Sequence, residues 1–348
     1  MTVYGERRKK LLSLAKGKQV VAATAPNLFY LTSFFGGGVA VVHPDKTVVV
    51  TFPLEADRAG EMCQESEIVV VKKRKDLLKE VERQLEKGKV VTDEEGAIKG
   101  GRFRAKPDVF LEARRVKDEV ELDLIRRACA GTDKTYERLA EVMRPGKTEW
   151  QLAAEVMKVA LEQGLTPSNS DSSLGPVIIA SGPHGAYGHS ELSDRKVRNG
   201  DLVVADLFFR YRGYNSDETR TFAIGTVSSE MKRHYAVVKE AQAAALAVAR
   251  EGKACGAVNE AAVEVLRKNG MDKLLNHTIG HGVGIDIHEL PWVRDGNKVK
   301  LLRNDVITDE PGVYLVGKFG VRIEDTLVVG KNRPEVLTKF TKDLVTCG

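Results

Sequence analysis

Short runs of β-branched residues alternate with helix-like segments in the N-terminal part of the chain. Four runs have the length and composition of strands, and two segments carry apolar residues at helical spacing. The strand-like runs are Gln19–Ala23, Val39–His43, Thr47–Phe52 and Ile68–Lys72, and the helical segments are Leu54–Gln64 and Asp76–Leu85. This pattern predicts a small α/β domain. The segment Lys99–Pro107 is rich in Gly, Lys and Arg and lacks clear periodicity, so we expect domains at residues 1–115 and 116–348.

The second domain is predicted to be α+β, with helices flanking a largely antiparallel, curved sheet. Its long first helix carries an apolar stripe at Val120, Leu124, Ala128 and Cys129, and Thr148 has the chemistry of an N-cap for the next helix. The predicted helices are Lys117–Val142, Thr148–Gln163, Ser229–Arg250 and Val258–Lys268. The predicted strands are Val177–Ala180, Leu202–Phe209, Thr219–Ile224, Val306–Ile307, Gly312–Leu315 and Val321–Val329.

The composition changes this picture little. A chain of 348 residues with 42% hydrophobic and 30% charged residues is typical of a globular protein of two domains. No apolar run approaches the roughly 18 residues of a membrane span, and the N-terminus lacks the apolar region of a secretory signal. The four cysteines are far apart, which favours a cytoplasmic location. Basic and acidic residues are interspersed, so we expect neither a nucleic-acid nor a membrane partner.

Four acidic residues lie within strand-like apolar runs of the second domain. They are Asp206 in LVVADLFF, Asp217 in DETRTFAIG, Glu310 in VITDEPGVY and Glu324 in FGVRIEDTLVV. A carboxylate in such a run is costly unless a positive charge compensates it. A salt bridge to Arg220 or Arg322 would explain any one of these acids taken alone. The presence of four such acids in one domain favours a shared site.

His281 adds an imidazole to this set. It lies in HTIGHGVGIDIHE, where the neighbouring glycines allow close approach. Several carboxylates with one imidazole suit Mn, Co, Fe or Zn rather than a thiolate-rich structural zinc site. Four carboxylates carry about four negative charges, which two divalent ions neutralise. The sequence therefore predicts a dinuclear metal site.

These motifs resemble those of the pita-bread metallopeptidases, in the branch that contains prolidase and aminopeptidase P. The matching segments are Asp206 with GYNSDETRT, then HTIGHGVGIDIHE, EPGVY and VRIED, in the same order and spacing. TAPNLFYLTSFFGG is similar to the non-catalytic N-terminal domain of that family. The resemblance implies a pita-bread catalytic domain preceded by a smaller α/β domain, two divalent ions (Mn or Co foremost), a peptide substrate and a homodimer.

Carried over residue by residue, the resemblance assigns roles at the site. It implies that Asp217 and Glu324 bridge two metals, that Asp206 chelates one, and that His281 and Glu310 ligate the other. It places His189, His277 and His288 beside the substrate, with His189 and His288 stabilising the oxyanion and Glu310 carrying the proton. For His277, a hydrogen-bonded core role is an equal alternative. The sequence leaves open whether Arg322 supports a metal ligand or only its strand.

Some positions depart from the family pattern, and the activity has alternatives. Phe208 stands where a glycine is common, and Gly188-His189-Ser190 replaces the usual Pro-His-Gly, so the shape of the substrate pocket is altered. Strand alternation predicts that Asp309 points away from the metals. The expected activity is hydrolysis of Xaa-Pro dipeptides. The alternatives are an aminopeptidase P that acts on longer peptides, a dipeptidase without strict proline preference, and a non-enzymatic binding module.

Overall fold

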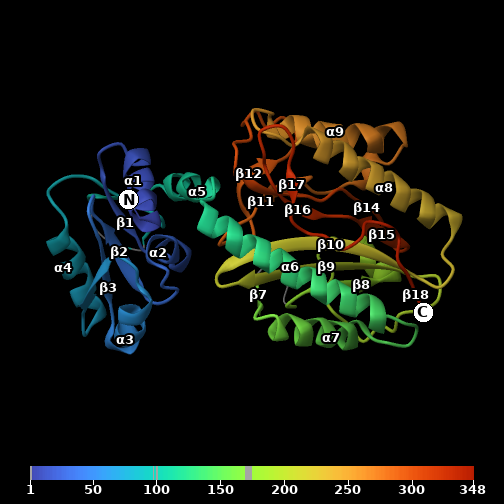
Figure 1. Ribbon diagram of the computed structural model, residues 1–348, viewed down its shortest axis with the longest axis horizontal. Helices are drawn as coiled ribbons and strands as arrows, with labels where there is room; N and C mark the ends of the chain where they lie inside the picture. Colours follow the sequence, from blue (N-terminus) through green and yellow to red (C-terminus); the bar gives the residue numbers. More distant parts are fainter. Residues whose placement is uncertain (1, 97, 99–100, 169–174) are drawn as a thin grey trace. The chain divides into compact units, whose positions relative to one another are not determined.

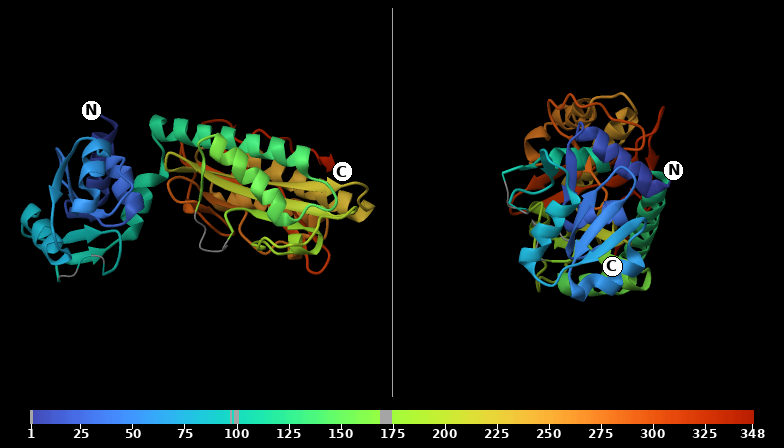
Figure 2. Two further views of the ribbon diagram at one scale, coloured as in Figure 1. Left: turned by 90° about the horizontal axis from the view of Figure 1, so that it is seen from below. Right: turned by 90° about the vertical axis from the view of Figure 1, so that its left-hand side faces the viewer.

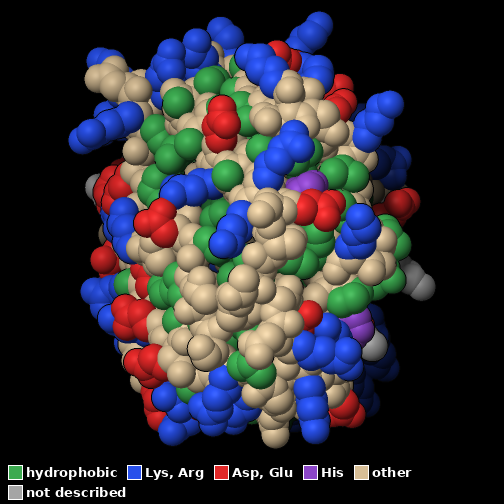
Figure 3. All heavy atoms as spheres, turned by 90° about the vertical axis from the view of Figure 1, so that its right-hand side faces the viewer, with side chains coloured by type: hydrophobic (Ala, Val, Ile, Leu, Met, Phe, Trp, Pro, Cys, Tyr) green, Lys and Arg blue, Asp and Glu red, His purple; other side chains and the backbone are tan. Residues whose placement is uncertain are grey.

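The structure is a computed structural model that describes residues 2–96, 98, 101–168 and 175–348. The chain divides into two compact units, Met1–Arg115 and Val116–Gly348, and each is described by itself. Within the described residues, no helix is long and apolar enough to cross a membrane. Basic and acidic side chains are interspersed over the face of the protein shown in Figure 3.

The first unit is a six-stranded mixed sheet with helices. Its helices are α1 (Val3–Leu14), α2 (Ala25–Thr32), α3 (Pro53–Met62), α4 (Arg74–Gln84) and α5 (Pro107–Arg115). Its strands are β1 (Gln19–Ala22), β2 (Gly38–Val42), β3 (Thr47–Thr51), β4 (Ser66–Val70), β5 (Val90–Thr92) and β6 (Phe103–Ala105). The sheet order is β4-β3-β2-β1-β5-β6, with β1–β2 and β2–β3 antiparallel and the other pairs parallel. The four predicted strands and two predicted helices are confirmed.

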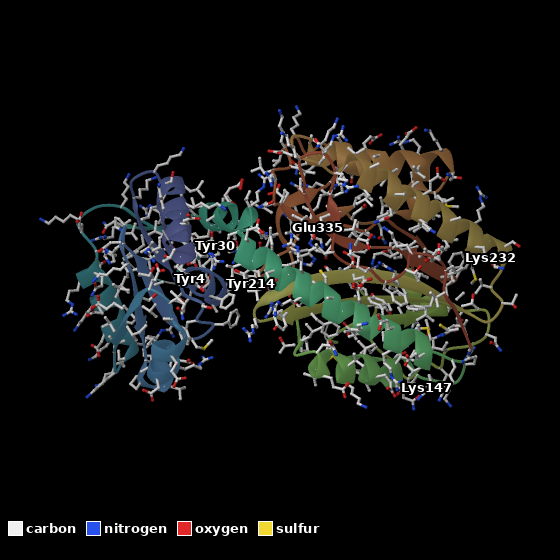
Figure 4. The ribbon with its side chains drawn as sticks, in the orientation of Figure 1. Tyr4, Tyr30, Lys147, Tyr214, Lys232 and Glu335 are labelled. Carbon is white, nitrogen blue, oxygen red and sulfur yellow. The ribbon has the colours of Figure 1, made fainter. Side chains whose placement is uncertain are left out.

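Strands β5 and β6 and helices α2 and α5 of the first unit were not predicted. Helix α2 follows β1 directly, and Asp93 holds its start by accepting hydrogen bonds from the backbone of Ala23 and Thr24. Arg7 on α1 lies over the rings of Tyr4 and Tyr30, at 5.3 and 4.9 Å from the ring centroids, and Figure 4 labels both tyrosines. These contacts fasten α1 and α2 to each other.

The second unit contains two main sheets, each with its own pair of helices. Its helices are α6 (Glu119–Val142), α7 (Glu149–Glu162), η1 (Gly182–Ala186), α8 (Ser229–Val248), α9 (Cys255–Lys268) and η2 (Asp272–Leu274). Its strands are β7 (Thr166–Pro167), β8 (Ile178–Ser181), β9 (Leu202–Tyr211), β10 (Tyr214–Ile224), β11 (Gly280–Gly282), β12 (Glu289–Val293), β13 (Val306–Asp309), β14 (Gly312–Leu315), β15 (Phe319–Arg322), β16 (Asp325–Val328), β17 (Glu335–Val336) and β18 (Thr346–Cys347).

One sheet has the order β18-β10-β9-β7, with β8 also paired to β9, and the other has the order β12-β11-β13-β16-β17. Helices α6 and α7 lie along the first sheet, and α8 and α9 lie along the second (Figures 1 and 2). Most strand pairs in both sheets are antiparallel. The predicted α+β arrangement is confirmed, although β11 and β12 lie in a segment for which no strand was predicted.

Helix α6 begins at a capping box, and its buried stripe shares only Ala128 and Cys129 with the predicted one. The Asp118 carboxylate accepts from the backbone N–H of Glu121, and Glu121 accepts from the backbone N–H of Asp118. Val120 is 47% exposed, so its predicted place in the core is wrong. The buried stripe instead runs through Leu122, Ile125, Cys129, Tyr136 and Leu139. The Tyr214 hydroxyl, labelled in Figure 4, donates to Glu121 and joins this end of α6 to β10.

The predicted strand Val321–Val329 is two strands, β15 and β16, with a break at Ile323 and Glu324. The backbone N–H of Glu324 donates to the carbonyl of Thr219 on β10, and these two residues form an isolated bridge between the sheets. Apolar residues continue on both sides of this break, so the sequence predicts one strand across it. It brings Glu324 to the strand that carries Asp217.

A buried group of charged residues lies next to this bridge. Arg220 on β10 pairs with Glu218 and Asp325, both at 2.9 Å, and Lys342 pairs with Asp325 at 2.6 Å. The Arg220 guanidinium also donates to the carbonyls of Phe340 and Thr341. Arg220 therefore compensates acids outside the predicted site, and the segment 338–342 closes over it.

Candidate functional site

The second unit contains a cavity of about 410 Å³ that brings together every residue predicted for the site. Its predicted members are Asp206, Asp217, His281, Glu310, Glu324, His189, His277 and His288. Arg322 and Phe208 also line it, with Gly188, Ile178, Asn276, Thr278, Ile287 and Trp292. Asp309 is not among the described lining residues, and it lies opposite Asp325 in the β13–β16 pair.

Strand register explains why these acids share one face. On β9, Asp206 and Phe208 are two residues apart and point the same way. The antiparallel partner of Phe208 is Asp217, and the partner of Asp206 is Thr219. The bridge from Thr219 to Glu324 adds a third acid, which lies at the break between β15 and β16.

Three side chains of the site form a group that could hold a metal ion. Ligand atoms of Asp217, His281 and Glu324 all lie within 4.8 Å of one another. The Nε2 atom of His281 lies 3.6 Å from Oδ2 of Asp217 and 3.4 Å from Oε1 of Glu310. Oδ1 of Asp206 and Oε1 of Glu324 are buried and have no hydrogen-bond partner in the structure. Buried carboxylate oxygens without donors are expected where a cation supplies the missing partner.

The hydrogen bonding of His281 fixes which ring nitrogen is available. Its Nδ1 lies 3.0 Å from the carbonyl of Gly282, and a carbonyl can only accept, so Nδ1 carries the proton. Nε2 therefore presents its lone pair to the carboxylates, as a metal ligand requires. Burial, assisted by His288, lowers the pKa of His281 to about 3, so this ring is neutral at physiological pH.

The carboxyl groups show the electrostatic cost of their proximity. Burial, followed by repulsion from neighbouring acids, raises the pKa of Asp217 and of Glu324 well above the usual range. Burial raises the pKa of Glu310 to about 8, with Arg322 opposing the shift. Divalent cations offset this repulsion, because they bind carboxylates in the ionised form and imidazole in the neutral form. The donor set fits a divalent metal site.

Arg322 links several parts of the site. Its Nη2 donates to Oδ2 of Asp206 at 2.7 Å, and its Nη1 donates to the Tyr314 hydroxyl at 2.7 Å. Its Nε donates to Thr219, whose hydroxyl donates to Oε2 of Glu324 at 2.7 Å. Arg322 therefore holds the orientation of two carboxylates as well as its own strand. Tyr314, in the quoted EPGVY motif, was given no role from sequence, because only the fold shows that it meets Arg322.

The three predicted substrate-side histidines differ in their surroundings. Both ring nitrogens of His277 are engaged, Nδ1 with the carbonyl of Thr278 at 2.7 Å and Nε2 with the Tyr314 hydroxyl at 2.8 Å. Burial lowers the pKa of His277 to about 4. His189 and His288 are both exposed. The His288 ring lies 4.3 Å from that of His281, centroid to centroid, and stacks on Trp292.

Comparison with known proteins agrees with this geometry. Residues 123–331 match metallopeptidase family M24. The chain is 32% identical to an Xaa-Pro dipeptidase of Pyrococcus horikoshii, over 99% of this chain and 100% of that protein. It is 39% identical to a probable dipeptidase, PepE, of Mycobacterium bovis over 64% of this chain, and the match spans 58% of that relative's length.

The solved structure of an Xaa-Pro dipeptidase from Bacillus anthracis superimposes with a TM-score of 0.90 at 26% identity, covering 99% of each chain. This match extends over both units, so the predicted fold of a catalytic domain preceded by a smaller domain is confirmed. A family match over more than half of the chain and a full-length relative together establish its membership. The chain belongs to metallopeptidase family M24.

Proposed function

We propose that this protein hydrolyses the peptide bond of Xaa-Pro dipeptides and that it uses two divalent cations, Mn or Co foremost. The observation that carries this proposal is the meeting of Asp217, His281 and Glu324 in a cavity that Asp206 and Glu310 also line. The substrate class is supported by the full-length relative that is an Xaa-Pro dipeptidase.

In this proposal, Asp217 and Glu324 would contact both cations, Asp206 would hold one, and His281 and Glu310 would hold the other. Two divalent ions would offset the four carboxylate charges, and Arg322 beside Asp206 would leave the site with a net charge of about +1. When bound, such ions polarise a carbonyl oxygen and lower the pKa of a water to near neutrality.

The side chains of this protein supply the remaining steps. Glu310 takes a proton from the attacking water and delivers it to the nitrogen of the leaving proline. The exposed rings of His288 and His189 donate hydrogen bonds to the oxyanion as it develops. The Xaa-Pro bond has no N–H to donate, and this mechanism requires none.

A second candidate activity is aminopeptidase P, which acts on longer peptides. A second hollow of about 550 Å³ shares Asn276, His277 and Thr278 with the main cavity, and it leaves room for further substrate residues. We also propose a homodimer, on the resemblance alone, and a cytoplasmic location, because the four cysteines are far apart in the sequence.

Metal-resolved kinetics on a panel of peptides test the proposal. After complete chelation, confirmed by elemental analysis, we expect no activity, and we expect Mn or Co to restore it with two ions bound per chain. The panel compares Xaa-Pro dipeptides, Xaa-Pro tripeptides and matched Xaa-Ala dipeptides. Full activity in metal-free protein, or no preference for the Xaa-Pro dipeptides, contradicts the proposal. Faster cleavage of the tripeptides identifies an aminopeptidase instead.

A further inference from the structure

One buried carboxylate outside the cavity gathers five donor atoms from the segment that carries His189. Glu149 is fully buried. Its Oε1 accepts from the backbone N–H and the hydroxyl of Ser181, at 2.8 and 2.7 Å. Its Oε2 accepts from the backbone N–H and the hydroxyl of Ser193, at 3.1 and 2.7 Å. Nδ1 of His184 lies 3.1 Å from Oε1, and it must donate because a carboxylate only accepts.

The helix that carries Glu149 does not need this side chain. Thr148 already caps α7, and a reciprocal capping box joins it to Gln151. The Glu149 carboxylate instead turns to Ser181 and Ser193, which flank the segment 182–192. Burying an ionised carboxylate is costly unless donors surround it, so this arrangement indicates that the segment's two ends must be held together.

Other contacts join the middle of this segment to the cavity. Gly185 and Gly320 pack so closely that a Cβ atom on Gly320 would lie 1.8 Å from the carbonyl oxygen of Gly185. Nη1 of Arg322 donates to the carbonyl of Gly188 at 3.3 Å. The next residue, His189, is exposed and lines the cavity. Its position therefore depends on a segment fixed at its ends by Glu149 and at its centre by β15.

We propose that Glu149 is a positioning residue: by holding Ser181, His184 and Ser193 on one carboxylate, it fixes the segment that presents His189 to the substrate. This inference rests on the proposed function, because it gives His189 a role in the reaction. Glu149 touches neither the substrate nor the ligand set, so its effect passes through His189.

The test combines Glu149→Gln with His189→Ala in a double-mutant cycle. The amide group of Gln places an N–H donor against the donors of one serine. The hydrogen bonds that hold one end of the segment 182–192 are therefore lost. We expect kcat on an Xaa-Pro dipeptide to fall about 10- to 100-fold, as when groups that orient active-site residues are lost, with two metal ions still bound. In the His189→Ala background, Glu149→Gln should lower kcat little further, because the residue through which Glu149 acts is gone.

Amide hydrogen exchange tests whether Glu149 holds this segment in place, without any assay of activity. Residues 182–193 should exchange faster in Glu149→Gln than in wild type. Ser193→Ala, which removes one donor and is milder, should shift both readouts in the same direction by less. Glu155→Gln is the matched control, because Glu155 lies on the same helix and pairs with Arg138 at the surface.

Additive losses in the cycle, or unchanged exchange in residues 182–193, overturn the proposal. If the wild-type protein cleaves no Xaa-Pro peptide, the proposed function fails by itself. In that case the exchange comparison, and the cycle run on a peptide that is cleaved, still decide the role of Glu149.

Discussion

Nη2 of Arg322 lies 2.7 Å from Oδ2 of Asp206, and both side chains are almost completely buried. The same guanidinium donates to Tyr314, whose hydroxyl meets Nε2 of His277. Arg322 therefore orients a carboxylate proposed to bind metal and, through Tyr314, a histidine proposed to lie beside the substrate. Four predictions follow from this and other relationships in the site.

Arg322→Lys should weaken metal binding or lower kcat/KM about 10- to 100-fold, because a lysine cannot make the planar set of contacts to Asp206, Tyr314 and Thr219. Titration with Mn and steady-state kinetics measure these effects. Arg333→Lys is the control, since Arg333 is exposed. Wild-type metal affinity and kcat/KM in Arg322→Lys would show that Arg322 supports only its strand.

Asp217→Asn and Glu324→Gln should each lose more metal than Asp206→Asn. Asp217 and Glu324 lie together at His281, whereas one oxygen of Asp206 is already bound by Arg322. Elemental analysis after dialysis gives the metal content of each variant. Asp309→Asn is a matched control, because that buried acid lies outside the described cavity lining. Equal metal in Asp217→Asn, Glu324→Gln and wild type would mean that neither residue bridges two ions.

His288→Ala should lower kcat by about 10²–10³-fold, the typical effect of losing one oxyanion donor, with two metals retained. Its side chain is exposed, so the melting temperature should change little. His234→Ala is the contrasting variant: His234 is buried against Phe319, and its loss should lower the melting temperature but not kcat. An unchanged kcat in His288→Ala removes His288 from the reaction.

The metal-free protein should lose stability as pH rises from about 6.5 to 8. Folding raises the pKa of Glu310 from 4.5 to about 8, so the folded protein binds more protons than the unfolded chain in this range. Stability then falls with pH, by up to about 1.4 kcal/mol per pH unit for each such group. The lowered pKa values of His277 and His281 make stability rise with pH, but only below about pH 6.5.

Thermal unfolding after chelation, measured across this pH range, checks this prediction. Glu310→Gln should make the decline shallower, because one titrating group is gone while Asp217 and Glu324, whose pKa values are also raised, remain. Added Mn should stabilise the protein more at pH 8 than at pH 6.5, since ligand protons then no longer compete with the metal. A metal-free protein whose stability rises from pH 6.5 to 8 would contradict the assignment of the raised pKa to Glu310.

The sequence was sufficient to predict the four acids and His281 as one group, because a carboxylate in an apolar strand is itself a signal. It could not show the break at Ile323 and Glu324, where a backbone bridge joins Glu324 to Thr219 on β10. The partners of Arg322 and His277 could not be predicted from the sequence either, because Tyr314 reaches both only through the β14–β15 pairing. These features depend on contacts between residues distant in sequence.

Glu149 shows a similar limit. Its place one residue after an N-cap is typical of a surface acid that complements a helix N-terminus. Only the pairing of β8 with β9 and the return of residues 193–195 past α7 reveal the donors that surround it. A buried acid of this kind is therefore recognised from its neighbours rather than from its own sequence context.

The segment 338–342 closes over Arg220 and Asp325, and this arrangement bears on synthesis. During translation, β10 and β16 leave the ribosome before Lys342 and the carbonyls that Arg220 uses. Until then, Glu218 and Asp325 face Arg220 without the full set of partners that they have in the finished protein. The buried charges of Arg220 and Asp325 can therefore gain all of their partners only after residues 338–342 have emerged from the ribosome.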